Sequence, residues 1–266
     1  MKYLKILGLA LFATAIITSC SDDDNPTDSG SAEAYFKMET GDTWVYENHE
    51  LDQDQNEIDD TKYYDTTTVV GEESYTDSKN ESKTAYKQRI AFSDGTDDDE
   101  LYFSNENEAV WTLSNFILPN GGEIENDGVS LDFGSLLNVW IKIIDNNETS
   151  WSIMNETDFT VEDAFAPGVD LKFTHSSSGK KAEKTTWTGL GKTHDAQKYI
   201  ITNNISVTSP VTKEIKIDAE LLFVENIGLV KMEVASQTIV IGQAPLSYDI
   251  EFNGTTRVLI DTNKDD

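Results

Sequence analysis

Apolar and polar residues alternate with a period of two along most of the chain after residue 34. In residues 211–224, charged side chains occupy one face and apolar ones the other, namely Ile215, Ile217, Ala219, Leu221 and Phe223. Residues 246–253 alternate in the same way. Such segments are typical of β-strands with one buried and one solvated face. This pattern favours an antiparallel sheet over a parallel one covered on both faces.

The same reading predicts an all-β or β-dominated fold with few short helices. Clusters of Asp, Asn, Ser and Gly at 52–56, 93–96, 119–122 and 176–180 predict strand reversals. Short helices are expected at most near 134–137 or 162–165. Residues 35–266 are expected to form a single antiparallel β domain, in one sheet or two, with a weak boundary near 119–128. The other predicted strands are 42–50, 62–70, 84–92, 100–104, 109–114, 139–144, 150–155, 171–175, 185–188, 198–208, 229–234 and 255–260.

The N-terminal twenty residues predict a signal peptide that ends at a lipid-modified cysteine. Lys2 and Lys5 precede an apolar run from residue 6 to residue 17, which is too short for a transmembrane helix. The sequence Ile-Thr-Ser-Cys at 17–20 resembles the lipobox of bacterial lipoproteins, and Cys20 is the one cysteine in the chain. The resemblance implies that residues 1–19 are removed and that acyl chains on Cys20 anchor the protein to a membrane.

The residues after the cysteine indicate to which membrane and which face the lipoprotein is exported. Ser21, Asp22, Asp23 and Asp24 resemble the acidic export signal of Bacteroidota lipoproteins, which implies the outer face of the outer membrane. The alternative is a merely solvated tether. Residues 20–34 have no large apolar side chain, so we expect a lipidated, flexible acidic stalk.

Two further segments resemble surface lipoproteins of Bacteroidota that have no known function. Residues 35–46 run aromatic pair, Gly, Trp-x-Tyr, and residues 223–231 resemble a GxGLVK hairpin with Asn226 in place of the first glycine. Such proteins often resemble the half-barrel of periplasmic lipoprotein carriers. The resemblance, carried by about twenty residues, implies a curved antiparallel sheet, half-barrel or sandwich-like, with an apolar concave face.

Charge excludes one class of partner, and motifs exclude several kinds of site. The 266 residues include 49 acidic and 20 basic side chains, a formal charge of −29, which argues against nucleic acid. Gly189 to Thr193 lacks the first glycine and the helix of a phosphate-binding loop, so a hairpin turn is expected there. The three histidines lack zinc-ligand spacing, and we find no catalytic motif. We therefore predict a protein that is not an enzyme and has no cofactor. The remaining alternative is a hydrolase, which would require a cleft with converging carboxylates or a serine–histidine contact of about 3 Å.

Two sets of residues remain as candidate sites. Asp52, Asp54 and Asn56 have the oxygen spacing of a calcium loop, and residues 97–100 are acidic, so weak divalent-cation binding is one hypothesis. Solvated hairpin tips are the alternative. Tryptophans in predicted strands usually fill a core. Trp111 and Trp151 lie closest to strand ends and are the candidates for exposed, ligand-stacking platforms.

These observations favour a non-catalytic binding module at the cell surface, for a lipid or other hydrophobic ligand on the concave face. The alternatives are a glycan-capturing lipoprotein and a structural or interaction subunit of an outer-membrane complex. A deep apolar groove would favour a lipid, and coplanar exposed tryptophans would favour a sugar. A filled sheet interior with an exposed apolar patch would favour an interaction subunit. The sequence identifies no protein partner.

Overall fold

The computed structural model describes residues 35–96, 98–114, 123–126, 129–132, 138–166, 169–209, 213–241 and 248–264. In these ranges it is almost entirely β-structure, with one short 3₁₀ turn at Asp59–Thr61. A strand occurs at every predicted position. The predicted reversal at 119–122 and the predicted helix at 134–137 lie outside the described residues.

One twelve-stranded sheet in which all paired neighbours are antiparallel makes up most of the described fold. Its strand order is β8-β5-β4-β3-β2-β1-β16-β13-β12-β11-β10-β9. In chain order the strands are β1 (Thr43–Leu51), β2 (Tyr63–Thr76), β3 (Ser82–Phe92), β4 (Asp99–Glu106), β5 (Ala109–Leu113), β8 (Trp140–Asp145), β9 (Ser150–Ala166), β10 (Val169–Gly189), β11 (Lys192–Ser209), β12 (Lys213–Val224), β13 (Gly228–Val234) and β16 (Gly254–Thr262).

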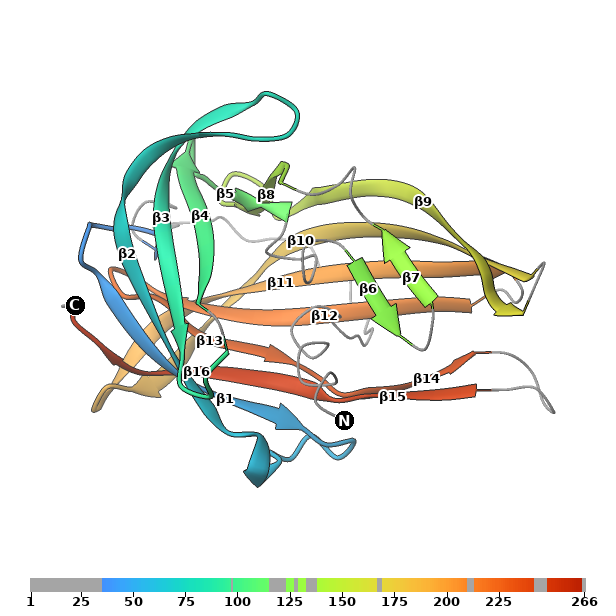
Figure 1. Ribbon diagram of the computed structural model, residues 1–266. Coiled ribbons are helices and arrows are strands. Elements are labelled where there is room, and N and C mark those ends of the chain that lie inside the picture. The colour runs from blue at the N-terminus through green and yellow to red at the C-terminus, as the bar shows by residue number, and fades with distance from the viewer. Residues whose placement is uncertain are drawn as a thin grey trace, which may run out of the picture.

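The sheet curves into a nearly closed barrel, as Figure 1 shows. Its two edge strands, β8 and β9, are consecutive in the chain and lie in contact. Near this seam, Lys181 of β10 donates its backbone N–H to the carbonyl of Thr149, at 2.9 Å. β9 to β12 are the long strands on one side, and their far ends extend beyond the barrel (Figure 1). The expected β fold with a curved antiparallel sheet is confirmed, and the sheet closes further than the half-barrel that the resemblance implied.

Two small hairpins form two-stranded sheets of their own. β14 (Gln237–Ile241) pairs with β15 (Tyr248–Phe252), and β6 (Glu123–Asn126) pairs with β7 (Val129–Asp132). The first pair lies beside the extended ends of β10 to β12 in Figure 1. The sequence predicted β15 and missed β6, β7 and β14.

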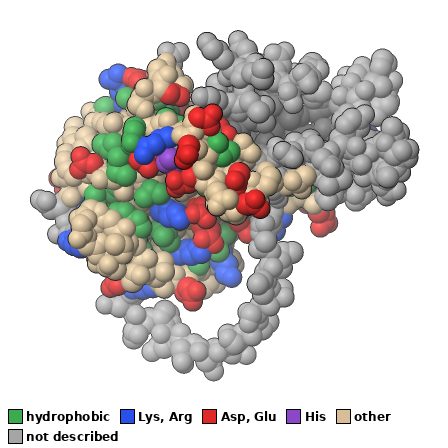
Figure 2. Space-filling model, turned by 90° about the horizontal axis from the view of Figure 1, so that it is seen from below, with side chains coloured by type: hydrophobic (Ala, Val, Ile, Leu, Met, Phe, Trp, Pro, Cys, Tyr) green, Lys and Arg blue, Asp and Glu red, His purple; other side chains and the backbone are tan. Residues whose placement is uncertain are grey.

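The inside of the barrel is lined largely with apolar side chains at the positions that the two-residue period assigns. On β12, Ile217, Ala219, Leu221 and Phe223 are all buried, whereas Glu214 and Glu220 are exposed. The largest buried cluster joins residues of this strand to β8, β9, β11 and β13. On the outside, Figure 2 shows acidic and basic side chains interspersed over one face.

Two predictions about β9 and β10 are wrong. Residues 162–165, a predicted short helix, lie within strand β9. Residues 176–180, a predicted reversal, continue β10, which pairs with both β9 and β11. Serine and glycine favour turns locally, but here the two flanking ladders satisfy the backbone hydrogen bonds of the segment.

Gly179 in that segment has a packing role. A Cβ atom placed on Gly179 would lie 2.1 Å from Cε2 of Trp151, because the indole covers this point of the strand. Glycine therefore lets a large aromatic side chain lie against the backbone inside the barrel.

We expect Gly179→Ala to lower the free energy of unfolding by about 2 kcal/mol or more, because the methyl group displaces the Trp151 ring from a packed core. Gly71→Ala is the matched control, because a Cβ at Gly71 meets nothing within 4 Å. Urea unfolding followed by tryptophan fluorescence measures both. Equal effects of the two substitutions would contradict this role of Gly179.

Candidate functional site

The segment that precedes β1 lies inside one end of the barrel. Tyr35 and Phe36 are each only 6% exposed, and both belong to the main core cluster. The Phe36 ring lies 4.5 Å from the ring of Phe223, centroid to centroid. Residues 35–38, which we call the N-terminal plug, therefore cover part of the inward apolar surface.

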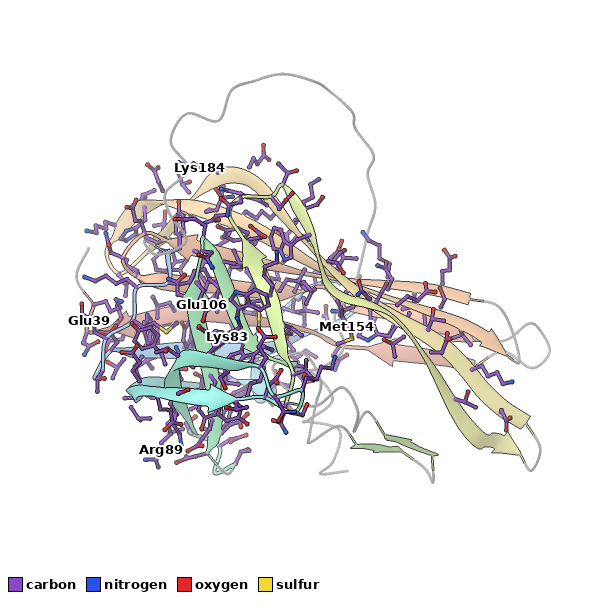
Figure 3. All side chains as sticks on the ribbon, turned by 90° about the horizontal axis from the view of Figure 1, so that it is seen from above. Glu39, Lys83, Arg89, Glu106, Met154 and Lys184 are labelled. Atoms are coloured by element: carbon purple, nitrogen blue, oxygen red, sulfur yellow. The ribbon has the colours of Figure 1, made fainter. Side chains whose placement is uncertain are left out.

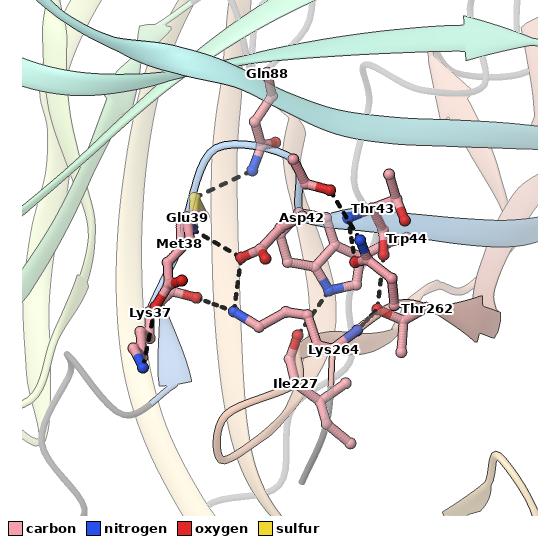
Figure 4. Close-up of polar contacts among 12 residues, drawn as sticks. Lys37, Met38, Glu39, Asp42, Thr43, Trp44, Gln88, Ile227, Thr262 and Lys264 are labelled. Carbon is pink, nitrogen blue, oxygen red and sulfur yellow. Dashed lines mark hydrogen bonds and ion pairs between the residues drawn. The ribbon is translucent and has the colours of Figure 1, made fainter.

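Polar contacts hold the plug in place, as Figure 4 shows. Lys264, just after β16, donates from Nζ to the carbonyl of Lys37 and to Oδ2 of Asp42, the latter at 3.0 Å. The same Asp42 oxygen accepts the backbone N–H of Glu39 at 2.8 Å. These contacts tie both ends of the described chain together at this end of the barrel.

The plug also makes one weak hydrogen bond. Gln88 on β3, which is 5% exposed, donates from Nε2 to the thioether sulfur of Met38 at 3.2 Å (Figure 4). A thioether is a poor acceptor, so this amide is only weakly satisfied in the plugged structure.

Beside the plug, β1 is fixed to the β12–β13 hairpin. Trp44 donates from Nε1 to the carbonyl of Ile227 at 2.7 Å, and Tyr46 donates from its hydroxyl to the carbonyl of Leu229 at 2.9 Å. The Trp44 indole is 4% exposed. These bonds join the start of the sheet to its centre and give the end of the barrel a fixed shape.

An apolar cavity of about 60 Å³ lies between the plug and the sheet. Its wall is formed mainly by aromatic and aliphatic side chains, among them Phe36, Met38, Phe103, Ile143, Leu221 and Phe223. Pockets for drug-sized ligands are roughly 300–1,000 Å³, so this cavity is small while the plug is in place. The plug contributes several lining residues, and its removal would enlarge the cavity.

One buried ion pair adjoins the apolar wall, to which its arginine belongs. Arg257 on β16 contacts Asp65 on β2 through two bonds, Nε to Oδ2 at 3.0 Å and Nη2 to Oδ1 at 2.7 Å. Asp65 is 3% exposed, and it also accepts from Asn48 at 2.9 Å. The guanidinium carbon lies 3.8 Å from the centroid of the Tyr46 ring, a stacked cation–π contact.

Burial shifts the acid–base properties of this network. Burial raises the pKa of the Tyr46 phenol, so the hydroxyl stays protonated and keeps its bond to Leu229. Burial alone would lower the pKa of Arg257, but the charge and hydrogen bonds of Asp65, together with Tyr46 and Tyr63, outweigh it and raise that pKa. Arg257 therefore keeps its charge inside the barrel.

Neither Arg257 nor Asp65 is among the residues predicted from the sequence. The two residues are far apart in the chain, and no motif connects them. Arg257 is one of only two arginines in the chain, and its strand places it on the same face as Leu259. A lone arginine at an inward position of a predicted strand is the signal that could have identified it.

The two tryptophans predicted as exposed platforms, Trp111 and Trp151, lie on opposite faces of the sheet. Trp151 is 7% exposed and lies against Gly179 inside the barrel, so it is not an exposed platform. Trp111 is half-buried on the outer face, with Nζ of Lys83 4.1 Å from its ring centroid. Lys83 is held by Glu106 at 3.0 Å, and Figure 3 shows the two together. Trp111 and Trp151 therefore do not form a coplanar exposed pair.

The predicted cation loop is a turn closed by its own backbone. Oδ1 of Asp52 accepts the backbone N–H groups of Asp54 and Asn56, each at 2.9 Å. These bonds lower the pKa of Asp52, the bond from Asn56 contributing most. In the ranges that the structure describes, no group of three or more His, Cys, Asp or Glu is arranged to hold a metal ion. Cation binding by Asp52, Asp54 and Asn56 stays a prediction.

A serine–histidine contact occurs inside the barrel but lacks the geometry of a catalytic triad. Nε2 of His175 lies 3.3 Å from Oγ of Ser177 and 3.1 Å from Oδ1 of Asn203. In a triad, the serine and the orienting residue contact opposite nitrogens of the imidazole, whereas both contacts here fall on Nε2. All three side chains are buried, which is typical of a structural polar cluster.

The expected hairpin turn at 189–193 is confirmed. Gly189 pairs with Lys192, and the two residues between them, Leu190 and Gly191, have φ angles of 51° and 83°. Two central residues with positive φ are typical of a tight β-hairpin turn. The segment is not a phosphate-binding loop.

The predicted lipid anchor is beyond the described ranges. Cys20 and the residues Ser21, Asp22, Asp23 and Asp24 lie outside them, so the anchor stays a prediction. Among the described residues, no helix is long and apolar enough to cross a membrane.

Comparisons with known proteins give two similar solved structures. No protein-family model matches the chain, and no curated protein matches it. A candidate lipoprotein from Parabacteroides distasonis ATCC 8503 is 12% identical with a TM-score of 0.45, covering 89% of this chain and 100% of that one. A candidate exported protein with a YmcC-like fold from Bacteroides fragilis NCTC 9343 is 12% identical with a TM-score of 0.40, covering 85% and 97%. Nothing about a ligand or partner follows from similarities of this size.

We expect His175 to make the protein less stable in mild acid. Burial lowers the pKa of His175 below its ordinary 6.5, so the unfolded chain takes up the proton at higher pH than the folded one. The free energy of unfolding should therefore decline as the pH falls below 6.5. His175→Gln keeps an amide near Asn203 and should remove this part of the decline. Urea unfolding of both proteins at several pH values between neutral and mildly acidic measures the difference, and parallel curves would contradict the expectation.

Proposed function

We propose that this chain is a non-catalytic lipoprotein of the outer membrane, which faces the cell exterior and binds a hydrophobic ligand inside its barrel. The observation that carries the proposal is the apolar cavity, whose wall includes the chain's own plug. A ligand that displaces the plug would gain the inward faces of Phe103, Leu221 and Phe223.

The composition of the plug supports this occupant. The side chains of Tyr35, Phe36 and Met38 together have about the volume of a mid-length acyl chain. They pack against the inward apolar side chains of the barrel, where such a chain could pack instead. Burial of apolar surface contributes about 25 cal/mol per Å², so a ligand of similar apolar area can compete with the plug. The plug is joined to the barrel through a single strand, which lets it leave without breaking the sheet.

Glycan capture has less support. Sugar-binding sites of the kind considered above need exposed, coplanar aromatic rings. Of the five tryptophans, Trp44, Trp140, Trp151 and Trp187 are each 7% exposed or less. Trp111 is half-buried, with a lysine above its ring. The geometry of the described residues therefore favours the interior of the barrel over its surface.

The location is proposed from the sequence. The lipobox at 17–20 and the acidic residues 21–24 support a lipid anchor and export to the surface. Residue 35, where the plug begins, is only fifteen residues from Cys20. The barrel would then stand close to the membrane from which a hydrophobic ligand could come.

The test is to express residues 21–266, which retain every described residue, and to extract the natively purified protein for lipid mass spectrometry. A near-stoichiometric acyl compound is the expected result. A protein without any bound hydrophobic molecule, which also fails to take up the neutral fluorescent probe N-phenyl-1-naphthylamine, would contradict the proposal.

Phe36→Ala should increase the apparent affinity for N-phenyl-1-naphthylamine by about tenfold or more. Loss of the contact with Phe223 weakens the closed plug, and a ligand that competes with the plug binds more tightly when the plug is less stable. Tyr64→Ala is the control, because Tyr64 is 37% exposed on the barrel surface. Fluorescence titration gives both affinities. Weaker probe binding in Phe36→Ala than in the control would show that the plug does not compete.

A further inference from the structure

The polar groups at and behind the cavity wall differ in how much hydrogen-bonding capacity they have left for a ligand. The Asp65 carboxylate accepts four hydrogen bonds, from Nε and Nη2 of Arg257, from Nδ2 of Asn48 and from the hydroxyl of Thr67. A carboxylate has about four lone-pair sites. The acceptor capacity of Asp65 is therefore used within the protein.

Donors at the same wall have capacity to spare. Arg257 uses Nε and Nη2 for Asp65, and Nη2 also contacts Thr67 at 3.0 Å. These bonds run through Nε and Nη2 and do not engage Nη1, and Arg257 lines the cavity. Gln88, on the same wall, donates only to the weak acceptor Sδ of Met38, which leaves when the plug leaves.

The two donors belong to one inward surface. Gln88 pairs with Val69 across β2 and β3, and Thr67, which contacts Arg257, lies two residues before Val69 on the same face. Diagonal neighbours on one face of a sheet are about 7–8 Å apart. Arg257 extends from β16 to Thr67 on β2, so its guanidinium and the Gln88 amide approach the same part of the inward surface, and a head group with several oxygen atoms carries an acceptor for each.

Charge decides which head group fits. The Arg257–Asp65 pair is neutral as a unit and almost entirely buried. A ligand carboxylate would place a second anion beside one guanidinium in an apolar cavity, and an unbalanced buried charge is strongly unfavourable. An uncharged oxygen acceptor adds no charge and satisfies the free donors.

We infer that the ligand is a neutral single-chain amphiphile, with ester, amide or hydroxyl oxygens bound by Arg257 and Gln88 and an acyl chain in the place of the plug. This inference rests on the proposed function and names the ligand class of the same cavity. It separates monoacylglycerol-like molecules from free fatty acids, which carry the same chain on an anionic head.

The experiment compares three probes with residues 21–266 at neutral pH, each below its critical micelle concentration. They are 1-monododecanoylglycerol, dodecanoate and N-phenyl-1-naphthylamine, and calorimetry or displacement of the fluorescent probe gives the affinities. We expect the glycerol ester to bind at least about tenfold more tightly than dodecanoate. Equal binding, or tighter binding of dodecanoate, would overturn the inference while uptake of the fluorescent probe keeps the proposed function. Failure of all three probes would overturn both.

Two substitutions test the assigned residues. Gln88→Leu should weaken the glycerol ester about fivefold and leave the fluorescent probe within about twofold, whereas Gln53→Leu, an exposed control, should change neither. Asp65→Asn keeps an acceptor oxygen but removes the counter-charge of Arg257, and should reverse the preference toward dodecanoate. If Asp65→Asn does not fold, the comparison of Gln88→Leu with Gln53→Leu tests the inference by itself. Equal losses of affinity for the ester and for the fluorescent probe in Gln88→Leu would overturn the role of the polar wall.

Discussion

The structure depends on filling the inside of one strongly curved sheet. A single antiparallel sheet exposes one face to water, and no long helix in the described residues covers the other. The sheet covers that face by curving until β8 and β9 meet. Closure brings Ile143 and Ile144 of β8 into one cluster with Trp151 of β9. The remaining gap at one end is filled by the plug, so the apolar interior and the position of the N-terminal segment have the same cause.

The buried ion pair joins three adjacent strands beside the cavity. Arg257, Asp65 and Asn48 come from β16, β2 and β1, three adjacent strands, and their bonds hold the inward faces in one register. Replacing a buried pair with apolar groups is often neutral or stabilising, so stability alone does not explain why a barrel would retain one. A polar group at a defined point of an apolar cavity gives orientation to a ligand, and this is the use that the geometry suggests.

Local pattern was sufficient for the strands and insufficient for the site. The period of two assigned Ile217, Leu221 and Phe223 to the core because side-chain alternation is a local property. It failed at residues 176–180, where Ser and Gly favour a turn locally but hydrogen bonding to both β9 and β11 keeps the segment in a strand. It could not bring Arg257 to Asp65, because that contact depends on β16 pairing with β1 and β1 pairing with β2. The position of the plug depends in turn on barrel closure, which no segment of sequence contains by itself.

The order of segments along the chain links the proposed anchor to the proposed site. The chain runs from Cys20 through an acidic segment to the plug and then directly into β1, where Trp44 is bonded to Ile227. Whatever displaces the plug leaves β1 in place, because Trp44 and Tyr46 hold the strand independently of residues 35–38. Displacement would therefore transfer residues from the barrel interior to the tether without unfolding the sheet. A ligand that enters the cavity would release the plug, and the released residues would lengthen the stalk between the barrel and the membrane. Occupancy of the cavity and length of the stalk would then depend on the same equilibrium between bound and released plug.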